Sequence, residues 1–338
     1  MPFFSSASIL NFNFPPLLAI LIHLRLFGFK FMCTTSSRFW AFWETSFNRL
    51  LAFLGPILVC FGTTAIWFII YIYFYCILPW LYNDKPVLEF KLQNLLNIFV
   101  SIYLAAAIFW NYFASVLALP KPLDTQRISA DQFHQLQIQT FKISGQVLRY
   151  CKFCQIIKEN RMHHCHICKR CIAVMDHHCP WIWNCVGEHN HHFFILLNLY
   201  LTFGSIYFSS LAFLPFINAL SSDYYWSSCC SRTIVIFSFI LSSTLLAALL
   251  GLTTQQFYLF FSGKTSIENH YQKTESDQAF DNPYDRGPNY HFEKFFGIQC
   301  SRPWFLWLIP GQVKLDSLKT ISLLSRNQAV IQETLRMV

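Results

Sequence analysis

Long apolar stretches without a charged residue dominate the hydrophobic pattern of this chain. A helix that crosses a bilayer needs about 20 mostly apolar residues. Four stretches are long enough and contain no Asp, Glu, Lys or Arg. They run approximately over Leu50 to Leu81, Leu95 to Leu119, Phe193 to Ile217 and Thr233 to Phe261. The pattern therefore predicts an α-helical integral membrane protein with four transmembrane helices.

A further apolar segment near the N-terminus, ILNFNFPPLLAILIHLRLFGF, is interrupted by Pro15, Pro16, His23 and Arg25. It could be an interfacial segment, a fifth span or a signal-like sequence, although no small-residue cleavage site follows it. The interruptions favour an interfacial segment or an unstructured extension. We interpret residues 1–49 as an N-terminal cytosolic or interfacial segment.

The charged residues are few and unevenly placed. They make up 12% of the chain, about half the usual share of a soluble domain, which is about 25%. Residues 120–192 and 263–338 hold nine Lys or Arg each, whereas the loops at 82–94 and 218–232 hold only two and one. Because Lys and Arg collect on the cytosolic side of membrane proteins, both termini and the central segment are predicted to be cytosolic. The net charge of +8 then fits a lipid bilayer as partner and gives no reason to expect nucleic acid.

These boundaries divide the chain into five parts. Residues 50–119 form transmembrane helices 1 and 2, residues 193–262 form helices 3 and 4, and residues 263–338 form a cytosolic C-terminal segment. Between the helix pairs, residues 120–192 form a cytosolic domain. Its first part is polar, and the alternation in QLQIQ predicts short strands there. No long internal repeat is apparent.

The second half of this domain concentrates the cysteines. Seven of the 13 lie between Cys151 and Cys185, in C-x2-C pairs with histidines among them. Such a cluster is typical of a metal site in a reducing compartment and not of a disulfide framework. Two C-x2-C pairs with further Cys and His predict two tetrahedral zinc sites. Eight ligands could be seven cysteines and one histidine or six cysteines and two histidines, and spacing alone does not decide. The Asp176-His177 pair beside Cys179 favours the second choice, because a metal-bound Cys179 would leave that pair without a role.

Many fixed positions of this region match a known family. The matching residues are Cys151-x2-Cys154, Lys158, Arg161, His163-His164-Cys165-x2-Cys168-x2-Cys171, Asp176-His177-His178-Cys179-Pro180-Trp181, Asn184-Cys185-Val186-Gly187, Asn190 and Phe194. The stretch resembles the DHHC cysteine-rich domain of the protein S-acyltransferases, or palmitoyltransferases. The resemblance is concentrated in residues 149–194, which form the core of the expected zinc domain.

The resemblance implies two structural zinc ions and one free thiol. One zinc would be held by Cys151, Cys154, His164 and Cys171, and the other by Cys165, Cys168, His178 and Cys185. Cys179, His177 and Asp176 would remain as the catalytic residues.

These three residue types can carry out thioester exchange. The thiol of Cys179 would attack a fatty acyl-CoA, most simply a palmitoyl donor, and the acyl group would then pass to cysteines of substrate proteins near the cytosolic membrane surface. His177 would take the thiol proton, and Asp176 would orient the ring. The resemblance also implies a multi-pass protein of the endomembranes, Golgi or endoplasmic reticulum, or of the plasma membrane.

Two C-terminal motifs extend the resemblance with departures. Thr265-Ser266-Ile267-Glu268 resembles the family's Thr-Thr-x-Glu motif, although alone it also reads as a helix capping box. Farther on, His291 stands where the family carries an asparagine, with Asn289 two residues away. The position of that motif therefore stays open between His291 and Asn289.

Other classes of membrane protein remain alternatives. A non-catalytic zinc scaffold would recruit partner proteins without needing Cys179, and a RING-type ubiquitin ligase would use its Cys and His residues as ligands. The leftover Cys179 and His177 count against the ligase. Spans without charged residues count against a transporter.

Overall fold

The computed structural model describes residues 37–82, 87–120, 127–144, 148–221, 230–274 and 282–291. The N-terminal apolar segment at residues 9–29 lies outside this part of the chain. The chain divides into two compact units, residues 1–50 and 51–338. The described part of the first unit is the beginning of one helix, and the elements that carry the site all belong to the second unit.

Long helices form where the sequence is apolar. Helix α2 (Ser37–Ile72) begins upstream of Leu50 and continues through a π-helical turn, η1 (Tyr73–Ile77), into α3 (Leu78–Tyr82). The other long helices are α4 (Val87–Leu117), α6 (His191–Leu220) and α7 (Arg232–Phe261). Within the described part of the chain, the segments long and apolar enough to cross a membrane are Ser46–Tyr82, Leu92–Leu117, His191–Leu220 and Arg232–Phe261. The prediction of four spans is confirmed.

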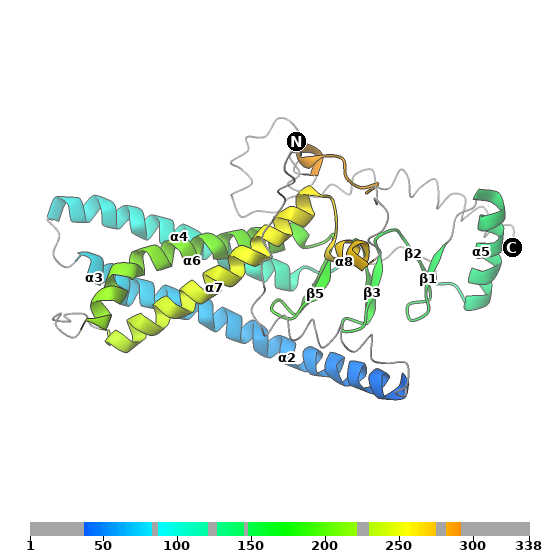
Figure 1. Ribbon diagram of the computed structural model, residues 1–338, viewed down its shortest axis with the longest axis horizontal. Helices are drawn as coiled ribbons and strands as arrows, with labels where there is room; N and C mark the ends of the chain where they lie inside the picture. The colour runs from blue at the N-terminus through cyan, green and yellow to red at the C-terminus, as the bar shows by residue number, and fades with distance from the viewer. Residues whose placement is uncertain are drawn as a thin grey trace, which may run out of the picture. The chain divides into compact units, whose positions relative to one another are not determined.

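Helix α6 lies alongside both α4 and α7 (Figure 1). Hydroxyl groups pair across the α6–α7 contact, with 3.0 Å between Thr202 and Thr253 and 3.1 Å between Ser209 and Ser242. Large apolar side chains such as Phe53 and Phe99 point outward, with exposed fractions of 70% and 71%. This arrangement suits lipid, because apolar groups need no burial there and small polar groups can hold helices together.

Three short β-hairpins follow one another between α4 and α6. They are β1–β2 (Arg149–Cys151, Ile156–Lys158), β3–β4 (His163–Cys165, Arg170–Ile172) and β5–β6 (His177–Cys179, Asn184–Val186). Their first strands start at 149, 163 and 177, so each hairpin begins 14 residues after the one before. The sequence showed no long repeat, and the structure adds this short one. The repeat consists of a shared turn geometry and of recurring metal-ligand positions. The residues between these positions differ from one hairpin to the next.

The polar segment before the hairpins is helical. The prediction of strands around QLQIQ was wrong, because residues Ala130–Ser144 form helix α5. A reciprocal capping box begins it: the Ser129 N–H donates to Gln132 Oε1 (2.8 Å) and the Gln132 N–H donates to Ser129 Oγ (3.2 Å). Two otherwise unpaired amides are satisfied in this way, which favours a helix start. The alternation of Gln with apolar residues did not outweigh that signal.

A disulfide joins two helices at the end of the bundle far from the hairpins (Figure 1). Cys76 lies in η1, and Cys230 comes directly before α7, with 5.7 Å between their Cα atoms. Both residues are buried. Sequence reasoning assigned no role to Cys230, because nothing in its spacing points to a partner 154 residues away. Disulfides persist in oxidising compartments and cysteine–metal sites in reducing ones, so the two ends of the bundle suit opposite sides of a membrane.

We expect this disulfide to form when the protein is made in cells. Thiol counting on denatured protein with a maleimide reagent should find two additional cysteines after reduction, and none additional in Cys76→Ser. The variant should also melt at a lower temperature, since disulfides typically contribute about 2–4 kcal/mol. Cys60→Ser, which removes an exposed free cysteine of α2, is the matched control. An equal thiol count before and after reduction of the wild type would contradict the disulfide.

Candidate metal centres and reactive cysteine

Eight Cys and His side chains of the hairpins gather in two groups. Their ligand atoms lie within 4.8 Å of one another in each group. The first group is Cys151, Cys154, His164 and Cys171, and the second is Cys165, Cys168, His178 and Cys185. These are the eight residues that the resemblance implied, and Cys179 belongs to neither group.

The separations within each group fit a tetrahedral metal ion. In the first group His164 Nδ1 lies 3.5, 3.3 and 3.8 Å from the sulfurs of Cys151, Cys154 and Cys171. In the second group His178 Nδ1 lies 3.7, 3.3 and 3.6 Å from those of Cys165, Cys168 and Cys185. Zinc with its usual Zn–S and Zn–N distances would hold such atoms roughly 3.5 Å apart. The donor sets therefore fit structural zinc ions.

The two groups interleave along the chain. Strand β3 supplies His164 to the first group and the next residue, Cys165, to the second. Adjacent residues of a strand point to opposite faces, so one strand can serve two ions. The backbone N–H groups of Cys154 and Cys168 approach the sulfurs of Cys151 and Cys165 at 3.4 and 3.3 Å. In each C-x2-C turn, the backbone therefore curves around the sulfur of the first cysteine.

Strand β5 and the residue before it carry the remaining polar groups. The Nδ1–H of His177 donates to Asp176 Oδ2 at 2.7 Å. Asp176 is buried, and the His177 side chain is 32% exposed. The Cys179 side chain lies close enough to the His177 ring to favour its charged form. The structure thus brings Asp176, His177 and Cys179 together in the order that a carboxylate–imidazole–thiol relay requires.

The charges of this set reinforce one another. Burial by itself disfavours the charged form of His177, but the interactions of its ring with Asp176 and Cys179 outweigh burial and raise the pKa of His177 to about 10. Burial likewise disfavours the Asp176 carboxylate, yet the His177 ring and a backbone N–H of Ser266 hold the pKa of Asp176 well below its usual range. The carboxylate therefore makes the His177 ring a stronger base and stabilises the imidazolium that forms when the ring takes a proton.

Helix α8 (Ser266–Thr274) fixes the Asp176 carboxylate from a distant part of the sequence. The Ser266 N–H donates to Asp176 Oδ1 (2.6 Å), and the Ser266 hydroxyl donates to Oδ2 (2.8 Å). The helix N-terminus also favours a negative charge at this place. The family resemblance implied that the motif containing Ser266 packs against the active-site region, but it did not identify Ser266 as the residue that binds Asp176.

The motif is also a capping box. The Thr265 N–H donates to Glu268 Oε2 (2.8 Å), and the Glu268 N–H donates to Thr265 Oγ1 (3.3 Å). Both interpretations of Thr265–Glu268 therefore hold at once: the box begins α8, and the residue inside it reaches Asp176.

Arg161 joins α8 to the metal-binding hairpins. Its guanidinium binds Glu268 with two bonds of 2.8 and 2.7 Å and donates to the Gly263 carbonyl at 3.0 Å. Its carbon lies 4.5 Å from the centroid of the Tyr284 ring. A bidentate pair of this kind resists rotation, so the segment after α7 is held in register with the hairpins.

The segment at residues 282–291 packs on the turn that ends α7. Asn282 Nδ2 donates to the Ser262 carbonyl at 2.7 Å. A Cβ on Gly263, whose φ is +61°, would lie 2.6 Å from His291 Cε1. His291 Nε2 in turn accepts from the Arg286 N–H at 3.3 Å. The His291 ring therefore packs against Gly263, and its hydrogen bond with the Arg286 N–H closes the short loop between Arg286 and His291.

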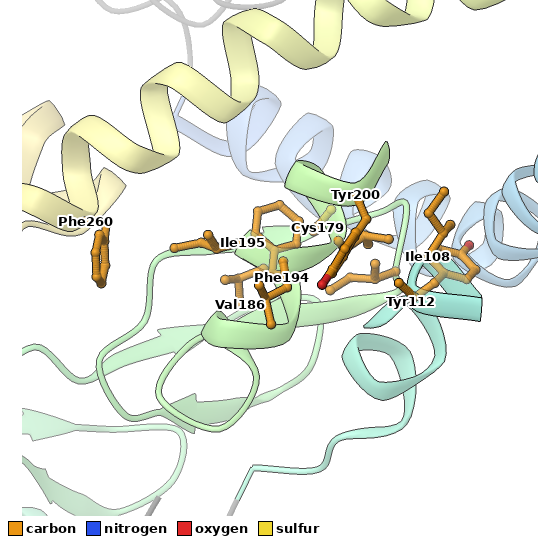
Figure 2. Packing of buried hydrophobic residues seen from close by; sticks show 12 residues of the cluster. Ile108, Tyr112, Cys179, Val186, Phe194, Ile195, Tyr200 and Phe260 are labelled. Carbon is orange, nitrogen blue, oxygen red and sulfur yellow. The ribbon is translucent and has the colours of Figure 1, made fainter. Parts of the chain in front are cut away.

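Cys179 lies in an apolar cluster at the membrane end of the hairpins (Figure 2). It is 6% exposed. The cluster contains Ala107, Ile108, Tyr112, Cys179, Ile182, Val186, Phe194, Ile195, Leu196, Leu197, Tyr200 and Phe260. These side chains come from α4, the β5–β6 hairpin, α6 and α7, so a group attached to Cys179 would begin among apolar side chains of the spans.

The described residues define a class of protein: a helical protein with membrane-spanning segments, two Cys–His groups that could each bind a metal ion, and a cysteine outside both groups beside a His–Asp pair. A family model of the DHHC palmitoyltransferase domain matches residues 146–273.

Known proteins give the same result. Probable protein S-acyltransferase 12 of Arabidopsis thaliana is 33% identical over 226 residues, which cover 65% of this chain and 75% of that protein. Probable protein S-acyltransferase 14 of the same plant is 28% identical over 227 residues, covering 63% and 71%. Palmitoyltransferase ZDHHC16B of Danio rerio is 27% identical over 305 residues, covering 78% and 75%. The chain belongs to the DHHC family of palmitoyltransferases.

Proposed function

We propose that this protein is a protein-cysteine S-acyltransferase that transfers a fatty acyl group, palmitoyl in the simplest case, from acyl-CoA through Cys179 to cysteines of substrate proteins. The observation that carries the proposal is the division of the Cys and His side chains. Eight form two metal-type groups, and Cys179 stays outside them beside His177 and Asp176.

The reaction exchanges one thioester for another. The Cys179 thiol passes its proton to His177, and the thiolate attacks the acyl-CoA carbonyl. The C–S bond to CoA breaks, and the CoA thiolate takes the proton from His177. In the second half, the thiol of a substrate protein gives its proton to His177 and attacks the Cys179 thioester, which restores the Cys179 thiol. Asp176 holds the ring and stabilises its positive charge in both halves.

The apolar cluster supports a fatty acyl donor over a small one. An acyl chain on Cys179 would start beside Phe194 and Ile195 and continue toward the spans (Figure 2). Each CH₂ group removed from water contributes about 0.8 kcal/mol, so a long chain gains from this position.

The two metal-type groups would support the reaction by holding the hairpins in their folded shape. Bound zinc would supply no chemistry to the reacting atoms here, because all four positions of each group are filled by protein ligands. His178 and Cys185 of the second group lie on β5 and β6, the strands of the Cys179 hairpin. Ligation would thus hold the hairpin that presents Cys179.

We further propose that the hairpins face the cytosol in a membrane of the secretory pathway or at the plasma membrane. The excess of Lys and Arg in residues 120–192 and 263–338 supports this orientation, as does the disulfide at the other end of the bundle. Substrate cysteines would then be cytosolic and close to the membrane.

The direct test uses purified protein and alkyne-tagged palmitoyl-CoA. The chain should acquire label that neutral hydroxylamine removes, one CoA should be released per labelled chain, and the label should pass to an added peptide with a cysteine. A chain that binds metal but neither acquires label nor releases CoA would favour the scaffold function instead.

Ser266→Ala should slow acyl-enzyme formation about tenfold. The variant loses one hydrogen bond to a charged carboxylate, a kind worth about 1.5–3 kcal/mol, while the backbone N–H bond to Asp176 remains. Rapid-quench labelling measures the rate. Ser266→Thr keeps the hydroxyl and should stay close to the wild type, so equal rates for Ser266→Ala and the wild type would contradict the positioning role.

A further inference from the structure

The three hairpins share one turn geometry. Each first strand ends in a cysteine, Cys151, Cys165 or Cys179, paired across the hairpin with the first residue of the second strand. Four residues after that cysteine, Gln155, Lys169 and Trp183 all have positive φ, at 58°, 54° and 46°. The Cys179 hairpin is therefore built on the same turn as the two metal-type hairpins.

One ligand position differs in the third hairpin. Three residues after the first cysteine stand Cys154 and Cys168 in the first two hairpins, and both belong to the metal groups. Ile182 stands at that position in the third, and it is 1% exposed. The third hairpin thus lacks the second cysteine of a metal-binding C-x2-C pair, because Ile182 stands at that position.

The surroundings of the hairpins differ in the same way. The buried apolar clusters around the first two hairpins are small, with four buried residues each, and half of these are cysteine ligands. Ile182 instead belongs to the large cluster that includes side chains of α4, α6 and α7. Apolar packing surrounds the third turn where the other turns have metal ligands.

Hydrogen bonds also tie the third hairpin to the spans. The Tyr112 hydroxyl of α4 donates to the Trp181 carbonyl at 3.0 Å. Asn184 Nδ2 donates toward the carbonyls of Ala118, Ser115 and Val116 at 2.8, 3.1 and 3.3 Å. The last carbonyls of a helix have no partner within it, so Asn184 satisfies the end of α4 and is held there.

Trp183 adds a contact with α2. A Cβ on Gly55 would overlap Trp183 Cδ1 and lie 2.6 Å from Cγ, so only glycine leaves room for the indole. Positive φ is unfavourable for a bulky side chain. The equivalent residues Gln155 and Lys169 are polar, whereas Trp183 is aromatic and remains 49% exposed beside α2. The ring contact with α2 accounts for a tryptophan in this turn.

We propose that the membrane helices take the place of a metal ion in the third hairpin, and that Ile182 keeps Cys179 unligated and reactive. Ile182, Trp183 and Asn184 are positioning residues in this account. Its importance for acyl transfer rests on the proposed function, whereas its chemistry can be tested on the Cys179 thiol alone.

The first experiment restores the missing ligand. In Ile182→Cys, the C-x2-C pair with Cys179 should bind Cd²⁺, a soft ion that prefers thiolates. Alkylation of Cys179 by iodoacetamide, followed by mass spectrometry of its peptide under reducing conditions, should slow at least about tenfold with micromolar Cd²⁺. Ile182→Val, treated in the same way, should show no such dependence on Cd²⁺. Equal Cd²⁺ dependence in the two variants would overturn the role of Ile182.

The second experiment tests the docking of the turn. Gly55→Ala should displace the indole and lower the rate of acyl-enzyme formation about tenfold, with the metal content of the wild type. Trp183→Asn alone should lower the rate by a similar factor, because asparagine tolerates positive φ but removes the ring. Gly55→Ala should then have no further effect in the Trp183→Asn variant, since both changes remove the same contact. A double variant slowed by the product of the two single effects would overturn the docking, as would Gly55→Ala at wild-type rate.

The two proposals fail in different ways. A wild type that forms no acyl-enzyme would contradict the proposed function. Alkylation of Cys179 would still test the role of Ile182. In the Gly55 and Trp183 variants, the same alkylation rate would test the docking of the turn. A wild type that forms the acyl-enzyme, with no Cd²⁺ effect and with independent effects of the Gly55 and Trp183 changes, would contradict only the role of Ile182 and the docking of the turn.

Discussion

Cys179→Ser should lose the acyl-enzyme and keep both metal ions. Serine is close in size to cysteine, but its hydroxyl is a far weaker nucleophile at neutral pH than a thiol paired with imidazole. Since Cys179 lies outside both groups of ligands, the metal centres do not depend on it. We expect labelling by alkyne palmitoyl-CoA to fall about 100-fold or more, with wild-type zinc content measured by atomic emission.

Two controls make this result specific. Cys60→Ser removes an exposed cysteine that is free in the structure and should label like the wild type. Label at wild-type level on Cys179→Ser would place the nucleophile elsewhere. Loss of zinc from Cys179→Ser would make this thiol a ligand, and the scaffold would become the better account of the protein.

Cys168→Ala should lose metal and, with it, the reaction, although Cys179 is intact. The Cys168 sulfur lies 3.3 Å from His178 Nδ1 and 3.4 Å from the Cys185 sulfur. Its removal leaves three ligands, two of which lie in the Cys179 hairpin. Metal binding and folding are coupled in such small domains, so the zinc content should fall from two ions per chain to one or none, with lower thermal stability.

The matched control is His166→Ala. His166 is exposed and lies between Cys165 and Cys168 in sequence, but it belongs to neither group. This variant should keep two zinc ions and its labelling. Fewer than one zinc in well-folded wild type, or an unchanged zinc content in Cys168→Ala, would contradict the paired metal centres.

Local spacing explains why so much of the site could be predicted. A metal ligand set in a short domain depends on residues a few positions apart, and the segment from Cys151 to Cys185 contains all eight. The relay also lies within four consecutive residues, from Asp176 to Cys179. The spans were predictable for a similar reason, because the bilayer requires one long apolar stretch for each of them.

Contacts between distant segments left no such pattern. Ser266 reaches Asp176 across 90 residues, and Arg161 reaches Glu268 across 107. Nothing in the spacing of either pair records the contact. The regular alternation of QLQIQ likewise suggested strands. A helix forms there instead, with a cap at Ser129 and with Phe133 stacked on Tyr150 at 4.8 Å between ring centroids.

The sequence by itself determined the four spans and the Cys and His cluster able to bind metal, because each depends on residue types at short, regular separations. Which eight residues form the two groups, and that Cys179 is left beside a His–Asp pair, followed from the resemblance to the DHHC domain, since spacing alone left two divisions open. Only the tertiary structure decided how Asp176 is held, that Cys76 pairs with Cys230, and that the third hairpin rests on the spans through Ile182 and Trp183. Those features depend on which distant surfaces meet when apolar area is buried and polar groups find partners, and that is settled by the folded chain as a whole.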